Sequence, residues 1–479
     1  MRVSLDSRTM RWQFSRFALF ASIVFFSAPF PVKGAEIRTP NFVIIFADDL
    51  GYGDLACYGH PTIRTPNLDR MAAEGMRFTD FYAAASVCTP SRAGLLTGRL
   101  PVRSGMCSDT RRVLFPDSAG GIPESEITLA EALKKQGYAT GCVGKWHLGH
   151  LPQYLPTRNG FDFFFGLPYS NDMDRVAEPK GGTTKSLDPW VEDFNVPLFR
   201  NEEIIERPAP QTTLTQRYTE EAIHFIKENK KKPFFLYFPH TFPHIPLFAS
   251  EEFHGKSPRG LYGDTVEEID WSVGCVLDTL RKEGLAENTL VFFTSDNGPW
   301  IIMGETGGSA GLLRDGKGST WEGGMREPAI AWWPERIKGG QVCRELSSTM
   351  DLFTTCVTLA GAKIPEDRVI DGVDMSPVLF ATGPSNRDVY FYYRGQTLYA
   401  IRKGPFKAHY ITRPAYGGGE PDEHDPPLLF HLGIDPSETT DVAEKYPEVL
   451  TEIQQIKVAH SASLEPVESQ LEKRVVQAD

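Results

Sequence analysis

The sequence lacks an internal hydrophobic segment long enough to cross a membrane, and its most apolar run lies near the start. That run, residues 17–26, has about ten residues, whereas a spanning helix needs about 20. Four arginines precede the run, and the small residues Gly34 and Ala35 follow it. The pattern predicts a signal peptide over residues 1–34, with an uncleaved anchor as the alternative. We therefore expect an exported protein without a stable membrane span after cleavage.

An excess of positive charge is also missing. The formal net charge is −12, and it becomes −16 if residues 1–34, with five basic residues and one acidic residue, are removed. A surface of that sign repels nucleic acid and anionic membranes, so we expect no nucleic-acid partner. An anionic ligand would need local positive charge from a metal ion or from Arg, Lys and His side chains.

Glycosylation sequons of the Asn-X-Ser/Thr type are absent, which removes one sign of a eukaryotic secretory product. Seven cysteines lie beyond the predicted signal peptide, and the odd count suggests that one of them has a role outside disulfides. We expect a periplasmic or secreted protein, or a lysosomal one if the source is eukaryotic. The sequence is compatible with a homodimer but does not define the oligomeric state.

Apolar strand patterns alternate with helical patterns through most of the chain. Strands are predicted at residues 41–47, 138–143, 233–238 and 289–294. Helices are predicted from Thr65, a candidate N-cap, to Gly75, and over residues 128–136, 215–229 and 264–283. This alternation predicts an α/β sheet covered on both faces.

The pattern changes near residue 386. Short alternating segments at 389–394, 397–402, 406–411 and 428–432 predict an antiparallel sheet with one solvated face. Residues 416–427 are predicted to be a loop, and residues 448–460 a closing helix. We therefore predict a catalytic α/β domain over 35–386 and a C-terminal domain of antiparallel sheet plus helix over 387–479.

Two of the predicted strands end in oxygen-bearing side chains, Asp48 and Asp49 after one and Asp296 and Asn297 after the other. Ligands bind beyond the carboxyl ends of strands in open α/β sheets. Three carboxylates and an amide oxygen suit calcium or magnesium better than zinc. The alternative is that these residues only cap turns.

A cysteine lies at a predicted helix start in the segment Cys88-Thr89-Pro90-Ser91-Arg92, followed by Leu96-Thr97-Gly98. Pro90 and Ser91 favour a helix start, so Cys88 is expected just before the first turn. That position attracts anions and lowers the pKa of a thiol, and Arg92 would add a fixed positive charge. A disulfide between Cys88 and another cysteine is the alternative.

This segment resembles the signature of the type I sulfatases of the alkaline phosphatase superfamily, in which the cysteine is oxidised to formylglycine. Further segments resemble other blocks of that family: Asp48 to Asp54, Gly144 to Gly149 with Lys145 and His147, Ser295 to Gly298, and Gly316 to Gly324 with Lys317. The resemblance covers residues 39–455. It implies a large mixed, mostly parallel sheet flanked by helices, alkaline-phosphatase-like, with a smaller C-terminal antiparallel sheet.

The resemblance also implies a mechanism of sulfate-ester hydrolysis. One Ca²⁺ per chain would bind Asp48, Asp49, Asp296 and Asn297, and a formylglycine-generating or other sulfatase-maturating enzyme would convert Cys88. The hydrated aldehyde would attack sulfur, with Asp296 as proton acceptor. In this mechanism Arg92 would stabilise the nucleophile, and Lys145 and Lys317 would stabilise the negative charge that develops during the reaction. His147 would be the base for sulfate release, and His244 would be the acid that protonates the leaving group. Ser170 would bind the sulfate. Taken singly, each Lys would be read as a surface residue and each His as a core residue or turn cap.

Within the family, segments such as Glu322 to Ala329 and Phe391 to Gly395 are similar to the N-acetylgalactosamine-6-sulfatases, which implies 6-O-sulfated galactosamine or galactose units of glycans as substrate. Leu167 to Asp172 is more similar to the arylsulfatase A type, the first alternative. Asp315 stands where both groups carry a cysteine, so one of their disulfides is expected to be absent. A phosphate or phosphonate ester hydrolase and a non-enzymatic calcium-binding lectin on the same fold are the remaining alternatives.

Overall fold

The computed structural model describes residues 39–181, 183–416 and 419–475, which belong to one compact unit. The predicted signal peptide lies outside these residues. None of the helices among them combines the length and apolarity needed to cross a bilayer.

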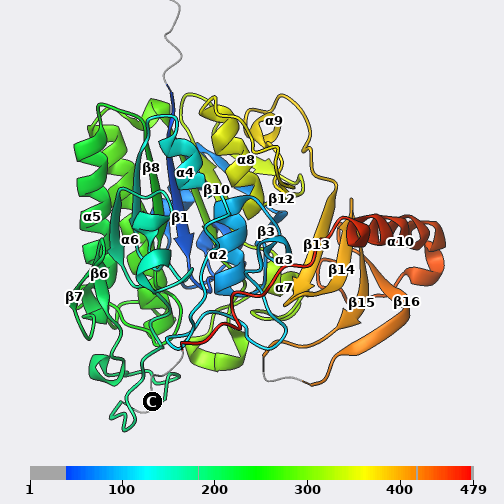
Figure 1. Ribbon diagram of the computed structural model, residues 1–479, viewed down its shortest axis with the longest axis horizontal. Helices are drawn as coiled ribbons and strands as arrows, with labels where there is room; N and C mark the ends of the chain where they lie inside the picture. The colour runs from blue at the N-terminus through cyan, green and yellow to red at the C-terminus, as the bar shows by residue number, and fades with distance from the viewer. Residues whose placement is uncertain (1–38, 182, 417–418, 476–479) are drawn as a thin grey trace, which may run out of the picture. The chain divides into compact units, whose positions relative to one another are not determined.

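A sheet of ten strands forms the centre of the molecule (Figure 1). Its strands in spatial order are β11 (Gln341–Cys343), β2 (Met76–Phe78), β10 (Ala329–Trp332), β9 (Thr289–Ser295), β1 (Asn41–Ala47), β8 (Phe234–Pro239), β4 (Ala139–Val143), β5 (Phe163–Gly166), β6 (Leu198–Arg200) and β7 (Glu203–Glu206). The five strands from β9 to β5 are parallel, and antiparallel neighbours extend the sheet at both sides. The predicted α/β class and mixed, mostly parallel sheet are confirmed.

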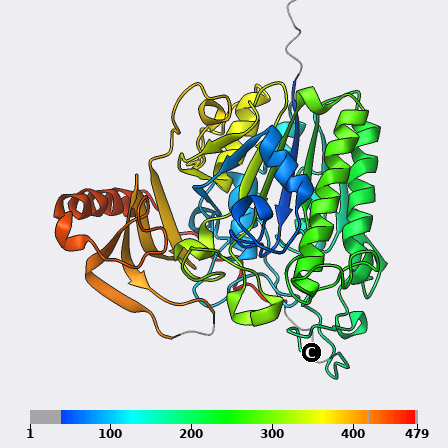
Figure 2. The ribbon, with the colours of Figure 1, turned by 180° about the vertical axis from the view of Figure 1, so that it is seen from behind.

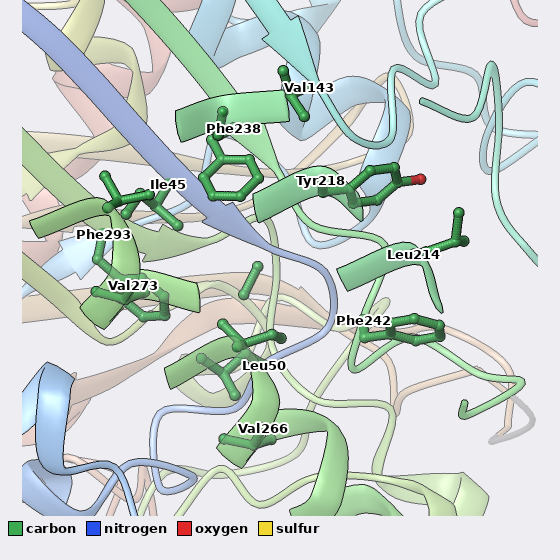
Figure 3. Close-up of a cluster of buried hydrophobic side chains, with 14 of the residues drawn as sticks. Ile45, Leu50, Val143, Leu214, Tyr218, Phe238, Phe242, Val266, Val273 and Phe293 are labelled. Atoms are coloured by element: carbon green, nitrogen blue, oxygen red, sulfur yellow. The ribbon is translucent and has the colours of Figure 1, made fainter. Parts of the chain in front are cut away.

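The central strand β1 is buried on both faces, which explains why its sequence is apolar without alternation. Phe42, Ile44 and Phe46 pack against α2 (Cys88–Thr97), α4 (Leu129–Lys134) and α8 (Thr349–Leu359). Val43 and Ile45 pack toward α1 (Pro66–Glu74), α5 (Leu214–Asn229) and α6 (Leu261–Lys282). Figure 3 shows this second side, where strand residues meet Tyr218 of α5 and Val273 of α6. Burying each large side chain contributes about 1.5–3 kcal/mol, so the sheet is held firmly beneath its loops.

The predicted starts of α1 and α2 are confirmed in position to within one residue. Thr65 is the N-cap residue of α1, as predicted, but its hydroxyl accepts a hydrogen bond from the Ala56 amide, 2.9 Å away, instead of capping the helix. Cys88 is the first residue of α2, with Val87 as N-cap, rather than a residue before the helix. By contrast, Thr128 caps α4 through a complete capping box, because Glu131 lies three residues later.

A four-stranded antiparallel sheet follows, with strands β13 (Val389–Arg394), β14 (Thr397–Lys403), β15 (Phe406–Thr412) and β16 (Asp422–His431). Helix α10 (Pro447–Ala462) packs on it, and both views show the two elements beside one end of the large sheet (Figures 1 and 2). The predicted loop at 416–427 was wrong in its second half, because Asp422 and Glu423 pair with β15. Edge position and a shift of register let β16 include two prolines, which is why its pattern did not predict a strand. The domain boundary at 387 stays a prediction.

A buried network of charges, which we call the interface network, joins the two sheets. Glu322, at the start of α7 (Glu322–Met325), and Glu438 lie 3.0 and 2.9 Å from the Lys407 amine of β15. Tyr82 donates a 2.6 Å hydrogen bond to Glu322, and His409 lies 2.7 Å from Glu438. Every carboxylate oxygen of this network has a partner.

The segment after α10 runs back across the catalytic part of the molecule, as the red trace in Figure 1 shows. The Ser469 hydroxyl donates to the Cys107 carbonyl across 362 positions of sequence, and the Gln470 amide donates to Gly105. Leu471 is fully buried in the core beneath α2 and α4. This C-terminal tail therefore holds the loop at residues 105–123 in place.

Candidate active site

The predicted site residues come together at the carboxyl ends of the parallel strands. Asp48 follows β1, Asp296 follows β9, and Ala47 pairs with Ser295 in register, so these acids emerge side by side. Lys145 follows β4, and His244 lies on the loop after β8. Elements that lie 40 to 250 positions apart in sequence thus supply one cluster.

The metal-type residues contact one another directly. The Asp49 amide donates to Asp296 Oδ1 at 3.1 Å, and Asn297 Nδ2 donates to Asp49 Oδ1 at 2.7 Å. Asp48, Asp296 and Asn297 are fully shielded from solvent. Burial raises the pKa of Asp296 to about 7, aided by the nearby charge of Asp48. Burial alone would raise the pKa of Asp48, but the surrounding Lys145, His244, Arg92 and Lys317 outweigh it and lower that pKa.

The backbone at the site is strained in two places. Asp49 and His147 have φ values of 65° and 59°, in the left-handed region that most side chains avoid. Gly144 has φ 128°, and a Cβ there would lie 1.8 Å from the Pro239 carbonyl oxygen. Such strain costs on the order of 1–3 kcal/mol per residue, and surrounding structure must hold it. The close approach at Gly144 brings Lys145 next to Asp48.

Cys88 faces the carboxylates from the first turn of α2. Its Sγ lies 3.6 Å from Asp48 Oδ1 and 3.6 Å from Lys317 Nζ. All seven cysteines are free, so the disulfide alternative for Cys88 is wrong. The expectation of a lowered thiol pKa is also wrong, because burial raises the pKa of Cys88 by more than Lys145 and Lys317 lower it. The helix start and the cations favour an anion held near residue 88 rather than a thiolate.

Three buried cations surround the acids. Arg92 donates to Asp296 Oδ2 from Nε and Nη2 at 3.1 and 2.9 Å, and Lys145 Nζ lies 2.5 Å from Asp48 Oδ2. Lys317 Nζ lies 2.8 Å from Asp49 Oδ2 and 4.3 Å from the Trp300 ring centroid. Burial works against the charge of Lys317, but Asp49 and Cys88 outweigh it and raise its pKa. Neither lysine is the surface residue that the single-residue alternative described.

The two histidines are held in defined tautomers. His147 Nε2 lies 2.9 Å from the Leu114 carbonyl, which can only accept, so Nε2 carries the proton and Nδ1 is left without a partner. His244 Nδ1 donates in the same way to the Ile245 carbonyl at 2.5 Å, leaving Nε2 3.7 Å from Asp49 Oδ2. Burial lowers the pKa of both rings well below the ordinary value, so both are neutral here.

Ser170 lies between the lysine and histidine groups. Its hydroxyl accepts a 3.0 Å hydrogen bond from Lys145 Nζ and lies 3.4 Å from both ring nitrogens of His244. The structure thus places Ser170 with the other predicted residues. His240, His150 and Arg99 lie outside the cluster: His240 packs on Phe238, His150 on Tyr169, and Arg99 pairs with Glu126.

A cavity of about 80 Å³ opens onto these groups, and Cys88, His147, Ser170, His244 and Lys317 line it. We call it the catalytic cavity. Residues that the sequence did not single out form the rest of the lining, namely Val87, Arg112, Val113, Phe115, Asp172, Met173, Trp300 and Tyr416. Asp172 Oδ1 is shielded without a hydrogen-bond partner, and burial raises the pKa of this carboxyl. In the sequence, the only feature that associated Asp172 with the site was its position two residues after Ser170.

The oxygen set fits a hard divalent cation. Asn297 Oδ1 is buried and has no hydrogen-bond partner, which is costly unless an ion or water satisfies it. Ligand atoms of Asp48, Asp49, Cys88 and His244 lie within 4.8 Å of one another. Oxygen donors at this density suit calcium or magnesium. The described residues therefore include a buried acidic, histidine and cysteine cluster that can hold a metal ion.

Together these groups define a class of protein. A residue at a helix start lies among carboxylates that can hold a cation, and three buried positive charges and two neutral histidines surround it. Such an arrangement binds an anionic group at residue 88 and stabilises charge that develops on it. It defines a hydrolase of anionic esters.

Comparisons with known proteins identify the ester. The chain matches the sulfatase family model over residues 40–362 and the model of the C-terminal region of aryl-sulfatase over residues 385–478. It is 44% identical over 475 residues to N-acetylgalactosamine-6-sulfatase of Mus musculus, covering 91% of this chain and 88% of that protein. It is 44% identical over 457 residues to arylsulfatase A of Homo sapiens, covering 88% of each. The solved structure of PsFucS1 sulfatase from Pseudoalteromonas sp. has a TM-score of 0.79 at 29% identity and covers 90% of this chain and 92% of that one.

The chain therefore belongs to the sulfatase family and is a sulfuric ester hydrolase.

Proposed function

We propose that this enzyme hydrolyses 6-O-sulfate esters on galactosamine or galactose units of sulfated glycans, with residue 88 oxidised to formylglycine and one Ca²⁺ per chain. The observation that carries the proposal is the position of Cys88 at the start of α2, 3.6 Å from both Asp48 Oδ1 and Lys317 Nζ. No unmodified thiol with a raised pKa would be an effective nucleophile there, which favours conversion of the residue.

Asp48, Asp49, Asp296 and Asn297 would hold the calcium ion. When bound, it would supply a Lewis acid that polarises a sulfate oxygen and orients the ester. Arg92 pairs with Asp296 and Asp48 from the far side and so fixes both carboxylates in place. Calcium rather than magnesium is proposed from the four oxygen-bearing side chains, since magnesium usually keeps several waters.

Residue 88 supplies the nucleophilic hydroxyl after its oxidation to a hydrated aldehyde. Asp296, which emerges beside Asp48 at the sheet edge, would receive its proton, and Asp48 itself lies 3.6 Å from Sγ. Ser170 lines the catalytic cavity and accepts a hydrogen bond from Lys145, and these two residues would hold the sulfate oxygens.

His147 is suited to the second half of the reaction. Its Nδ1 is unprotonated, has no partner in the structure, and belongs to a side chain that lines the catalytic cavity. It can therefore accept the proton of the second hydroxyl of residue 88, which releases sulfate and restores the aldehyde.

His244 and Lys317 would serve the leaving oxygen. The neutral tautomer of His244 has no proton on Nε2, so it must take one up before it can act as an acid. An anionic ester bound beside it would raise its pKa and favour that step. Lys317 remains charged and would stabilise negative charge on the leaving oxygen.

The choice of a 6-O-sulfated galactosamine unit rests on similarity to the N-acetylgalactosamine-6-sulfatases. Arylsulfatase A is equally identical over a slightly shorter length, so an arylsulfatase-type substrate is the second candidate. We further propose export after cleavage near residue 34 and conversion of Cys88 by a sulfatase-maturating enzyme.

Sulfate release from a panel of defined sulfated saccharides, measured with and without a calcium chelator, tests the proposal. We expect release from N-acetylgalactosamine 6-sulfate and galactose 6-sulfate, a loss of at least about 100-fold with chelator, and recovery on adding Ca²⁺. Matched 4-sulfates and 6-phosphates are the controls. Equal turnover of the 6-phosphates would favour the phosphate-ester alternative, and activity that survives chelation would contradict the calcium site.

A further inference from the structure

A second, larger cavity lies beside the catalytic cavity, at the junction of the two sheets. Its volume is about 450 Å³, and its walls come from the loop at residues 105–123, the end of β13 and the segment after β15. We call it the junction cavity. Three residues, Val87, Arg112 and Tyr416, line both cavities, so the two cavities are neighbours. Val87 directly precedes residue 88 in the sequence.

The junction cavity is positively charged. Arg112, Arg394 and Arg413 line it, and Asp109 is the one carboxylate among its lining residues. The Asp109 carboxylate accepts a 2.7 Å hydrogen bond from the Gln396 amide, so it is occupied in holding a turn. In a protein of net charge −12, this local excess of positive charge is unusual.

Two of the three guanidinium groups, those of Arg112 and Arg394, flank the ring of Tyr416. The guanidinium carbons of Arg112 and Arg394 lie 4.2 and 5.6 Å from the Tyr416 ring centroid. Arg394 Nη1 donates to the backbone carbonyls of Arg413 and Pro414 at 3.4 and 2.9 Å. Among the residues that the structure describes, no carboxylate lies within ion-pair distance of Arg112, Arg394 or Arg413. Neighbouring like charges left unpaired at a cavity wall favour an external anion.

The size and position of the junction cavity suit a neighbouring sugar. The catalytic cavity, at about 80 Å³, is large enough for the reacting group, whereas the junction cavity has several times that volume. A saccharide whose sulfate points to residue 88 would leave the catalytic cavity past Tyr416 and Arg112. Tyr416 offers an aromatic face, and Thr397 and Tyr399 offer hydroxyl groups to such a sugar.

We propose that the junction cavity is an anion-binding subsite that recognises a second acidic group on the saccharide next to the one that loses its sulfate. This inference rests on the proposed function and deepens it: the preferred substrate is an acidic oligosaccharide rather than a single sulfated sugar. The acidic group is a carboxylate or a second sulfate, and Arg112, Arg394 and Arg413 bind it. The subsite also concentrates a polyanionic substrate against the negative charge of the rest of the protein.

The test compares sulfate release from three disaccharides that share a 6-sulfated galactosamine but differ in the neighbouring sugar. That sugar is neutral, carries a carboxylate, or carries a sulfate. For the wild type we expect a lower KM for at least one acidic disaccharide than for the neutral one. Arg413→Gln and Arg112→Gln should each raise that KM about tenfold. Arg413 lines the junction cavity but not the catalytic cavity, so Arg413→Gln should leave kcat for that disaccharide within about twofold.

The choice of variants limits structural side effects. Within the part of the chain that the structure describes, the Arg413 side chain donates to the Gly419 carbonyl alone. Arg112 is exposed and stacks on Tyr416, so neither replacement removes a buried ion pair. Arg413→Lys should recover part of the affinity because it keeps the charge. Arg344→Gln, an exposed arginine that does not line the cavity, is the matched control and should leave all three KM values unchanged.

The outcomes separate the subsite from the proposed function. Equal KM values for acidic and neutral disaccharides in the wild type, or variants that do not change their ratio, would overturn the subsite while leaving sulfate hydrolysis intact. If the wild type releases sulfate from none of them, the proposed substrate is wrong, and equilibrium binding of the acidic disaccharides decides. Equal binding by the wild type and an Arg112→Gln, Arg413→Gln double variant would then overturn the subsite too.

Discussion

The acids at the strand ends and the acids of the interface network are equally buried, yet their surroundings differ. Asp48 and Asp296, like Glu322 and Glu438, have no exposed surface. The interface network satisfies every carboxylate oxygen and no catalytic side chain belongs to it. The site cluster opens onto the catalytic cavity and leaves Asn297 Oδ1 without a partner.

This difference shows how the role of a buried charged residue can be inferred from its partners. A buried ion pair is weak evidence of stability by itself, and breaking one leaves a costly lone charge. Complete pairing of the carboxylate oxygens in the interface network indicates a structural role, namely the attachment of β15 to α7. Incomplete pairing next to strained backbone and a cavity indicates a functional role. Variants in the two clusters should therefore affect different measurements.

The largest expected effect comes from Cys88→Ala. Removal of the nucleophile should lower kcat by at least about 10⁴-fold, because the remaining groups only bind and polarise the ester. The melting temperature should stay within about 4 °C of the wild type, since the thiol makes only two long contacts among the described residues, each of 3.6 Å, to Asp48 and Lys317. Sulfate release and thermal unfolding measure the two effects. Cys88→Ser is the matched control, because serine supplies one hydroxyl but not a second. This variant should accumulate a sulfated enzyme that mass spectrometry can detect. Wild-type turnover in either variant would contradict the assignment of residue 88 as the nucleophile.

The opposite pattern is expected for Glu322→Gln. Burial raises the pKa of Glu322, but Lys407, Arg326 and Arg402 outweigh it and lower the pKa to about 2. Because this pKa is depressed from 4.5, the stabilisation is complete above pH 4.5 and is lost as pH falls toward 2. The difference corresponds to on the order of 3 kcal/mol.

The unfolding free energy of Glu322→Gln should therefore be lower at neutral pH by about that amount, with kcat retained. Its stability should also fall less steeply than that of the wild type between pH 4.5 and 2. Glu366→Gln, at an exposed residue outside the network, is the control. Parallel acid unfolding of Glu322→Gln and wild type would show that the pairing does not contribute as described.

The smallest effect is expected for Asp315→Ala, which lies between the two clusters. Asp315 Oδ2 accepts a 2.8 Å hydrogen bond from the Ala415 amide and so fixes the segment that carries Tyr416 into the wall of both cavities. Loss of this hydrogen bond should weaken substrate binding by about 1 kcal/mol. We therefore expect a several-fold rise in KM with little change in kcat. Asp315→Asn keeps an oxygen acceptor and should behave more like the wild type. A change in kcat alone would contradict this positioning role.

Most of the fold and the centre of the site could be predicted from sequence, for local physical reasons. Apolar strands that end in Asp48-Asp49 and Asp296-Asn297 predict the carboxyl edge of the sheet, and the Cys88 segment predicts a helix start. The wrong details have local causes as well: burial, which sequence does not report, reverses the thiol pKa expected from the helix start.

The surroundings of the site could not be predicted. Arg112 comes from a loop, Arg394 from the end of β13 and Arg413 from the segment after β15, and only the packing of the smaller sheet brings them to one cavity. Asp172 has an ordinary turn sequence and gains meaning only from its unpartnered oxygen in the catalytic cavity. These residues depend on contacts between segments hundreds of positions apart, which no local pattern encodes.

The C-terminal tail has a consequence for the order of events during synthesis. Cys88 is 2% exposed in the finished fold, so the oxidising enzyme that we propose would have to reach it earlier. The loop that covers the site cannot be fastened until Ser469 and its neighbours have been made, 362 positions after Cys107. The C-terminal tail is therefore synthesised well after residue 88. The interval before the tail packs on the loop is the time in which the proposed modification of residue 88 could take place.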